Sequence, residues 1–243
     1  MSPRISELWV YLAASPLLGL TFTLLAYQGA LFVNKRCHAH PLANPVLLAV
    51  AVVVMALWAT GTPYRTYFDG AQFVHFLLGP ATVALAIPLY AQLGRLKRMA
   101  VPLLVALLAG SITAACSAVL IGRLFGASAA TLLSLAPKSV TTPIAMGIAE
   151  HLGGLPSLTA VLVILTGILG AVGANGVYAL LKIDDPAVRG FALGTASHGI
   201  GTARAFQVNE QTGAFSALAM GLNGLLTALL LPWLMPLLLR GLG

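Results

Sequence analysis

The chain has 243 residues, of which 59% are hydrophobic and only 8% are charged, and its formal net charge is +7. Soluble domains average roughly 45–50% apolar and about 25% charged residues, so this composition excludes an ordinary water-soluble protein. The Lys and Arg residues fall in short clusters between apolar runs, as in the cytoplasmic loops of membrane proteins. This distribution excludes nucleic acid as a partner.

Apolar runs suited to membrane helices, which need about 20 residues, follow one another along the chain. They lie at residues 8–33, 45–60, 73–92, 100–121, 129–151, 155–181, 191–206 and 214–239. Lipid requires every backbone group to be satisfied internally, so we predict an all-α integral membrane protein embedded in the lipid bilayer. The first run is longer than the core of a signal peptide and precedes Lys35 and Arg36, so we expect it to remain in the membrane.

Basic clusters set the expected orientation, because Lys and Arg favour cytoplasmic loops. The clusters occur at residues 35–36, 95–98, 182–189 and 240. They all face one side only if the run at 129–151, broken by Pro137, enters the membrane and returns as a re-entrant hairpin. The later helices then run opposite to their earlier counterparts, which predicts an inverted repeat with halves 1–125 and 126–243 in one transmembrane domain.

A short C-H-x-H cluster, Cys37, His38 and His40, lacks the usual fourth ligand and precedes Pro41, which marks a turn. We therefore predict no metal site, and no cofactor is expected. The second cysteine, Cys116, lies far along the chain within an apolar run, so no disulfide framework is inferred.

The segment 134–150 carries unusual polar density for an apolar stretch. Pro137 and Pro143 interrupt the helix and free backbone groups that protein, water or a bound ion must satisfy. Lys138 is costly at membrane depth and is usually partnered or placed in a wet cavity. Ser139, Thr141 and Thr142 add hydroxyl groups. A broken helix of this kind predicts a ligand site.

The segment 193–207 contains three glycines and a second group of polar side chains, Ser197, His198, Thr202 and Arg204. The free amides of an interrupted helix, together with Lys138 and Arg204, favour a small anion such as a carboxylate. Imidazole gains and loses a proton near neutral pH, so His198 is a candidate for carrying a coupling proton.

Other interpretations remain open for several of these residues. The glycines, including Gly199, are also compatible with close helix packing alone, and Arg204 with a helix end from which its side chain reaches the surface. Glu150 is equally compatible with proton coupling and with a membrane interface. Asn223 is expected to make an interhelical hydrogen bond rather than to contact a substrate.

An enzyme is not expected. Neighbouring side chains on a helix point about 100° apart, so Ser197 and His198 are not placed as a nucleophile and its base. The run from Gly194 to Gly199 also has one residue too many before the serine for the G-x-S-x-G elbow.

Three blocks of sequence resemble the LrgB/CidB family: LLGPATVALAIPLY at residues 77–90, LAPKSVTTPIAMGIAE at 135–150 and GFALGTASHGIGTARAFQ at 190–207. The resemblance covers nearly the whole chain. It implies a bacterial inner-membrane protein that is either antiholin-like, affecting murein hydrolase export and cell lysis, or a transporter of glycolate, glycerate, lactate or pyruvate.

The family is similar in turn to the cation:proton antiporter and anion transporter group. This similarity implies a transporter bundle with two crossed, interrupted helices and an elevator-like movement, and the antiholin-like role implies a small LrgA-type partner. A homo-oligomer is also expected. The substrate-binding residues implied on this sequence are Pro80, Thr82, Lys138, Ser139, Thr141, Thr142, Ser197, His198, Gly199, Thr202 and Arg204, with His198 and Glu150 as candidates for proton coupling.

Overall fold

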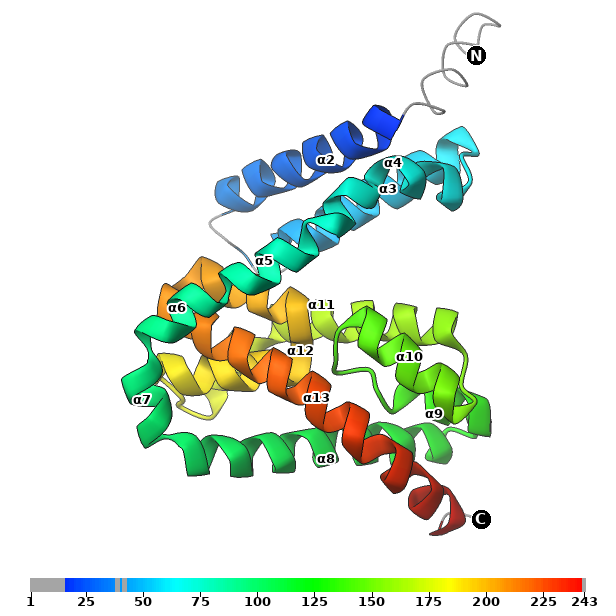
Figure 1. The fold of residues 1–243 in the computed structure, drawn as a ribbon. Coiled ribbons are helices and arrows are strands. Elements are labelled where there is room, and N and C mark those ends of the chain that lie inside the picture. The colour runs from blue at the N-terminus through cyan, green and yellow to red at the C-terminus, as the bar shows by residue number, and fades with distance from the viewer. Residues whose placement is uncertain (1–15, 38–39, 41–42, 242–243) are drawn as a thin grey trace, which may run out of the picture. The chain divides into compact units, whose positions relative to one another are not determined.

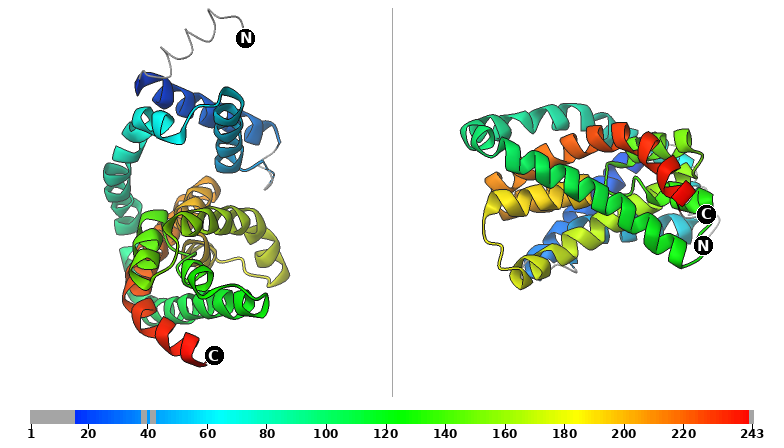
Figure 2. Two further views of the ribbon diagram at one scale, coloured as in Figure 1. Left: turned by 90° about the vertical axis from the view of Figure 1, so that its right-hand side faces the viewer. Right: turned by 90° about the horizontal axis from the view of Figure 1, so that it is seen from below.

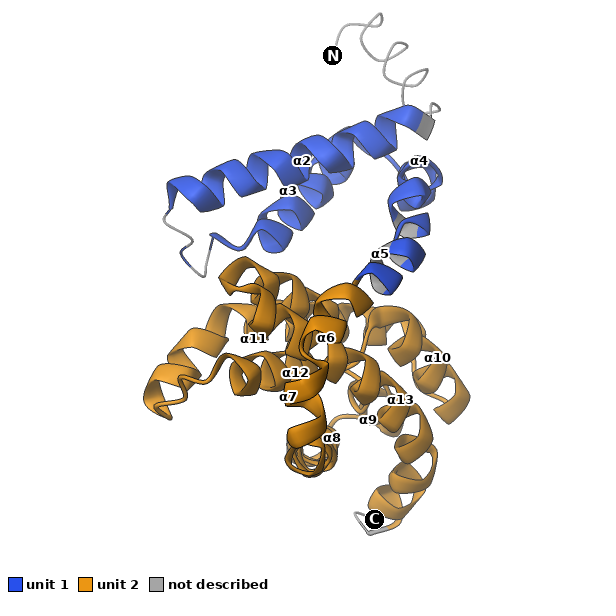
Figure 3. Ribbon diagram, turned by 60° about the vertical axis from the view of Figure 1, so that its left-hand side comes forward, with its two compact units in different colours: residues 1–84 blue, residues 85–243 orange. Residues whose placement is uncertain are grey.

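The computed structural model describes residues 16–37, 40 and 43–241, and every regular element in that part of the chain is a helix (Figure 1). The all-α prediction is therefore confirmed for the described residues. The chain forms two compact units, residues 1–84 and 85–243, which Figure 3 colours blue and orange. This boundary differs from the one expected between repeat halves near residue 125, and the inverted repeat stays a prediction.

The helices of the first unit are α2 (Pro16–Arg36), α3 (Pro45–Thr60), α4 (Tyr64–Phe76) and α5 (Leu78–Ala84). The helices of the second unit are α6 (Ala86–Ala91), α7 (Leu93–Arg98), α8 (Ala100–Leu124), α9 (Ala129–Leu135), α10 (Thr142–Leu152), α11 (Pro156–Leu180), α12 (Pro186–Val208) and α13 (Glu210–Gly241). The cluster at Cys37, His38 and His40 falls partly outside the described residues.

The ends of α3 show how local sequence sets helix boundaries. The Oδ1 atom of Asn44 accepts hydrogen bonds from the amides of Val46 and Leu47, at 2.9 and 3.2 Å, and Pro45 occupies the first turn, where its missing N–H costs nothing. Gly61 ends the helix in the left-handed conformation, with φ of 63°.

The run at residues 73–92 does not form the single spanning helix that its hydrophobicity predicts. The chain instead turns at Leu77, Leu85 and Gln92, giving the short helices α5 and α6. Pro80 and Pro88 each lie at the third residue of one of these helices. A proline lacks the N–H of an interior helical bond but is tolerated in a first turn, so each proline favours a restart of the helix.

Four described helices are long and apolar enough to cross a membrane: Leu17–Arg36, Ala100–Leu124, Pro156–Leu180 and Glu210–Arg240. They correspond to four of the apolar runs in the sequence and support a multi-pass membrane protein. α3 is apolar but has only 16 residues, which at 1.5 Å per residue is shorter than a hydrocarbon core of about 30 Å.

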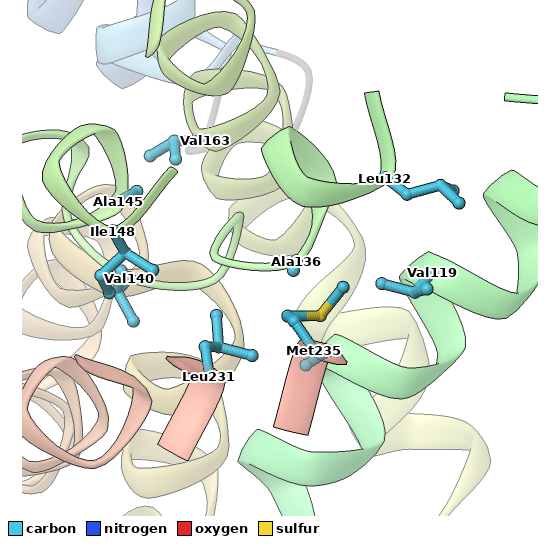
Figure 4. Packing of buried hydrophobic residues seen from close by; sticks show 10 residues of the cluster. Val119, Leu132, Ala136, Val140, Ala145, Ile148, Val163, Leu231 and Met235 are labelled. Atoms are coloured by element: carbon cyan, nitrogen blue, oxygen red, sulfur yellow. The ribbon is translucent and has the colours of Figure 1, made fainter. Parts of the chain in front are cut away.

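A buried core surrounds the link between α9 and α10 in the second unit. Val119 of α8, Leu132 of α9, Val163 of α11 and Leu231 and Met235 of α13 are buried together (Figure 4). The link itself contributes Val140, so its position is set by apolar packing from several helices rather than by its own sequence.

α12 and α13 pack against each other more extensively than any other pair of described helices. The right-hand view of Figure 2 shows the two helices in yellow to red. Gly190 and Gly194, one turn apart on α12, allow this approach. A Cβ atom at either position would overlap the backbone carbonyl of Thr212 or Ser216 on α13. Small residues spaced by four are the usual means of close helix packing in membranes.

Candidate functional site

The first element of the site is the interruption between α9 and α10. α9 ends at Leu135, and α10 begins at Thr142 with Thr141 as its N-cap and Pro143 in its first turn. Between them the Lys138 amide donates to the Leu135 carbonyl at 3.1 Å, and the Val140 amide donates to the Pro137 carbonyl at 3.2 Å. The expected break in this segment is therefore present, whereas its re-entrant course stays a prediction.

The second element is a kink within α12. His198 has φ of 42° and ψ of −133°, which is outside the helical region and positive in φ. Its ring nitrogen Nε2 lies 3.0 Å from the Val163 carbonyl on α11, and its own carbonyl accepts a hydrogen bond of 2.9 Å from the Thr202 hydroxyl. These contacts hold a backbone conformation that non-glycine residues rarely adopt.

Two glycines of α11 make room for the kinked part of α12. A Cβ atom at Gly167 would lie 2.8 Å from Cε1 of His198, and a Cβ atom at Gly170 would overlap the Ser197 hydroxyl. The Ser197 hydroxyl is buried and has no hydrogen-bond partner among the residues that the structure describes. Buried hydroxyl groups nearly always have a partner, so Ser197 has capacity for a bound group.

Asn223 of α13 connects the two interruptions. Its Nδ2 atom donates to the carbonyls of Ser139, at 3.2 Å, and Thr195, at 3.0 Å. The interhelical role expected for Asn223 is thus confirmed, and its two acceptors belong to the break after α9 and to the turn that precedes the kink in α12.

A cavity of about 670 Å³ lies between these elements in the second unit. Its walls are mostly apolar, and one side is a face of α8 with a residue at every fourth position: Pro102, Ala106, Gly110 and Ala114. Its polar lining comes from Lys138, Ser139, Thr166, Thr195 and Ser197. The volume is in the usual range of about 300–1,000 Å³ for small-molecule sites.

Lys138 is half-buried in this lining, and its Nζ atom donates to the Ser139 hydroxyl at 3.2 Å. The ion pairs among the described residues join Arg95 to Asp185 and Arg189 to Asp184, so no described carboxylate balances Lys138. A cation beside apolar walls and without a counter-ion strongly favours a bound anion.

Comparison with known proteins decides the family. The model of the LrgB-like family matches residues 23–237, which is most of the chain. The protein is a member of the LrgB-like family. The resemblance drawn from the three sequence blocks is thereby confirmed.

Relatives of this LrgB-like chain match it over nearly their whole length. The uncharacterized protein YwbG of Bacillus subtilis (strain 168) is 39% identical over 90% of this chain and 97% of its own. The antiholin-like protein LrgB of Bacillus mycoides (strain KBAB4) is 31% identical over 91% of this chain and 96% of its own. No solved structure matches the chain significantly.

The structure of this LrgB-like protein brings together some of the expected substrate-binding residues. Lys138, Ser139 and Ser197 line the cavity. The residues that do not line it are Thr141, Thr142, His198, Gly199, Thr202 and Arg204. All of these except Thr202 and Arg204 lie within three residues of a lining residue of the same segment in the chain. Their direct role in binding stays a prediction.

Arg204 was expected to act with Lys138 on a carboxylate. It lies on α12 after the kink, where its Nη1 atom donates to the Gln207 side chain at 3.0 Å. Of the two basic residues, Lys138 alone lines the cavity. Arg204 is six positions after His198, about 9 Å of helical rise, which places it well along the part of α12 that follows the kink.

The remaining expected residues lie elsewhere. Pro80 belongs to α5 in the first unit, and the side chain of Thr82 lies outside the described residues. Glu150 is exposed near the end of α10. Both interpretations of Glu150, proton coupling and a membrane interface, remain predictions.

Sequence reasoning missed three contributors to the cavity: Gly170, the Thr195 face of α12, and the small-residue face of α8. The spacing of Pro102, Ala106, Gly110 and Ala114 is visible in the sequence as a helical period of small residues. The sequence does not predict what this face of α8 packs against, because only the packing of the helices brings α8 opposite the two interruptions.

Proposed function

We propose that this protein is a multi-pass transporter of small monocarboxylate anions in the bacterial cytoplasmic membrane. The observation that carries the proposal is the position of Lys138, half-buried in a mostly apolar cavity with no described carboxylate beside it. A lone ammonium group in such surroundings gains most from an anion that brings a single compensating charge.

The lining favours a small organic anion over a bare inorganic ion. Ser139 lies in the break after α9 and Ser197 lies beside the kink in α12, so the two interruptions each offer one hydroxyl group to a carboxylate oxygen or to a second polar group of the substrate. The apolar walls suit a short carbon chain. Glycolate, glycerate, lactate and pyruvate have this character, and His198 and Glu150 are the proposed residues for proton coupling.

A second function is favoured by the relatives. Several proteins that are 31% identical over 91% of this chain carry the name antiholin-like protein LrgB. This name supports a regulator of murein hydrolase export and cell lysis more directly than it supports transport. We propose that such a regulator acts with a small LrgA-type membrane protein and as a homo-oligomer, and that an anion-binding cavity is not needed for it.

Uptake of labelled glycolate, lactate and pyruvate into proteoliposomes, with and without a proton gradient, separates the two functions. We expect saturable uptake by the wild type and a loss of about tenfold or more in Lys138→Ala, because a hydrogen bond to a charged group contributes about 1.5–3 kcal/mol. Lys97→Ala, which removes an exposed lysine outside the cavity, is the matched control and is expected to stay within about twofold of wild type.

Absence of uptake by well-folded wild type, also with an LrgA-type partner present, would exclude carboxylate transport and leave the regulatory function. Equal uptake by Lys138→Ala and wild type would show that transport does not use this cavity.

A further inference from the structure

Asn223 is the buried amide at the centre of the second unit, with only 1% of its surface exposed. Its Oδ1 atom accepts hydrogen bonds from the hydroxyl groups of Ser111 on α8 and Thr227 on α13, the latter at 3.4 Å. Its Nδ2 atom uses both hydrogens on backbone carbonyls. A primary amide has two donor and two acceptor positions, so Asn223 is fully satisfied in this arrangement.

The two carbonyls that Asn223 binds are the ones released by the interruptions. The Ser139 carbonyl belongs to the non-helical stretch between α9 and α10. The Thr195 carbonyl is the group that a straight helix would offer to the amide of Gly199, but His198 between them has non-helical dihedral angles. The Asn223 side chain therefore takes the place of helical N–H donors at both interruptions.

The space directly beside the Asn223 amide leaves little room for a water molecule to make these hydrogen bonds instead. A void of about 10 Å³, lined by residues that include Ser111, Ser139 and Asn223, adjoins the amide. This volume is at the lower limit of about 10–15 Å³ that one water requires. In this void, water therefore has little room to replace the amide.

Ser139 and Thr195 also line the cavity that contains Lys138. We propose that Asn223 is a positioning residue of the anion site, which holds the two interruptions in fixed register so that Lys138 and Ser197 face one cavity. The role in binding rests on the proposed transport function. The structural part, the coupling of the two interruptions through one amide, does not depend on it.

Asn223→Leu tests the proposal because leucine has the same number and branching of side-chain heavy atoms and no hydrogen-bond donor. The hydroxyl groups of Ser111 and Thr227 then turn to carbonyls of their own helices, as serine and threonine commonly do, whereas the carbonyls of Ser139 and Thr195 lose their partner. The matched control is the double variant Ser111→Ala/Thr227→Val, which removes both contacts to Oδ1 and keeps both contacts of Nδ2.

The first measurement is hydrogen exchange of the protein in nanodiscs without substrate. In Asn223→Leu we expect faster exchange at both residues 137–143 and residues 194–201, and in the control variant we expect no change at either. The second measurement is uptake kinetics, in which Asn223→Leu is expected to raise KM by about tenfold with a smaller change in the maximal rate, because displaced binding groups chiefly weaken substrate binding.

Faster exchange in Asn223→Leu at neither interruption, or at only one, would overturn the proposal, as would equal effects in the control variant. Coupled exchange without carboxylate uptake by wild type would retain the structural coupling and reject the transport function. If Asn223→Leu does not fold, the same exchange measurement on Asn223→Asp decides, since its carboxyl group keeps both acceptor contacts and loses at least one of the two donor contacts.

Discussion

At the scale of single residues, the backbone at His198 is the least ordinary feature of the site. A positive φ in a residue with a Cβ costs on the order of 1–3 kcal/mol and persists only where surrounding contacts hold it. Here the ring contact to Val163 and the Thr202 hydroxyl supply such contacts, and Gly167 leaves space for the ring. The kink opens α12 beside Ser197, so the strain lies where the site needs an interrupted helix.

This strain predicts that glycine is more stabilising than alanine at position 198, the reverse of their usual order in a helix. His198→Gly and His198→Ala both lose the ring contact and differ only by the Cβ atom, so we expect His198→Gly to be the more stable by about 1 kcal/mol. Ala203→Gly, in the regular part of α12, should instead lower stability by about 1 kcal/mol. Thermal unfolding in detergent measures both. A less stable His198→Gly would show that this backbone is not strained.

At the scale of helices, the contact between α12 and α13 fixes the second interruption against Asn223. Gly190 and Gly194 place the backbone of α12 against the carbonyls of Thr212 and Ser216. The Thr202 hydroxyl adds a hydrogen bond of 3.0 Å with the Ser216 hydroxyl. The packing therefore sets the distance from the kink to α13, and with it the reach of the Asn223 amide.

Gly194→Ala is expected to separate α12 from α13, because its Cβ atom would overlap the Ser216 carbonyl and the helix backbone has no rotamer to relieve the clash. Overpacking of this kind typically costs about 1–3 kcal/mol. Gly221→Ala on α13, where a Cβ atom meets nothing within 4 Å, is the control and should be neutral or slightly stabilising. Thermal unfolding of the two variants distinguishes a packing glycine from a dispensable one.

At the scale of the whole molecule, the ion pair between Arg95 and Asp185 bears on topology. Its 2.5 Å contact brings the basic cluster at 95–98 next to the loop that follows α11. α8 begins and α11 ends near this ion pair, and both helices are long enough to span a membrane. If both helices cross, the end of α8 and the start of α11 share the opposite side, as the predicted re-entrant course of segment 129–151 requires.

Cysteine labelling in intact cells tests this topology, after Cys37→Ser and Cys116→Ala remove the native thiols. A re-entrant segment predicts that Phe125→Cys and His151→Cys, both at exposed positions, react with an impermeant reagent from outside, whereas Lys97→Cys reacts only after permeabilisation. Reaction of His151→Cys from the side opposite to Phe125→Cys would instead mean that the segment crosses the membrane.

Local sequence patterns predict the fold class, the first interruption and the lysine of the site. Hydrophobicity alone predicts a helical membrane protein, since lipid leaves the backbone no other partners than its own. The prolines at 137 and 143 predict the first interruption, because a missing N–H acts within one helical turn. A lysine among apolar residues marks a site, since an unpartnered charge at that depth is costly.

Only the tertiary structure determined the features that no local sequence pattern predicts. No proline marks the kink at His198, and the run at 73–92 reads as one span although it folds as short helices. Helix packing determines that Lys138 lines the cavity and Arg204 does not. It also brings Asn223 to the backbone carbonyls of residues 84 and 28 positions away in the chain. Hydropathy and turn chemistry act over a few neighbouring residues, whereas these contacts join helices that are distant in the chain.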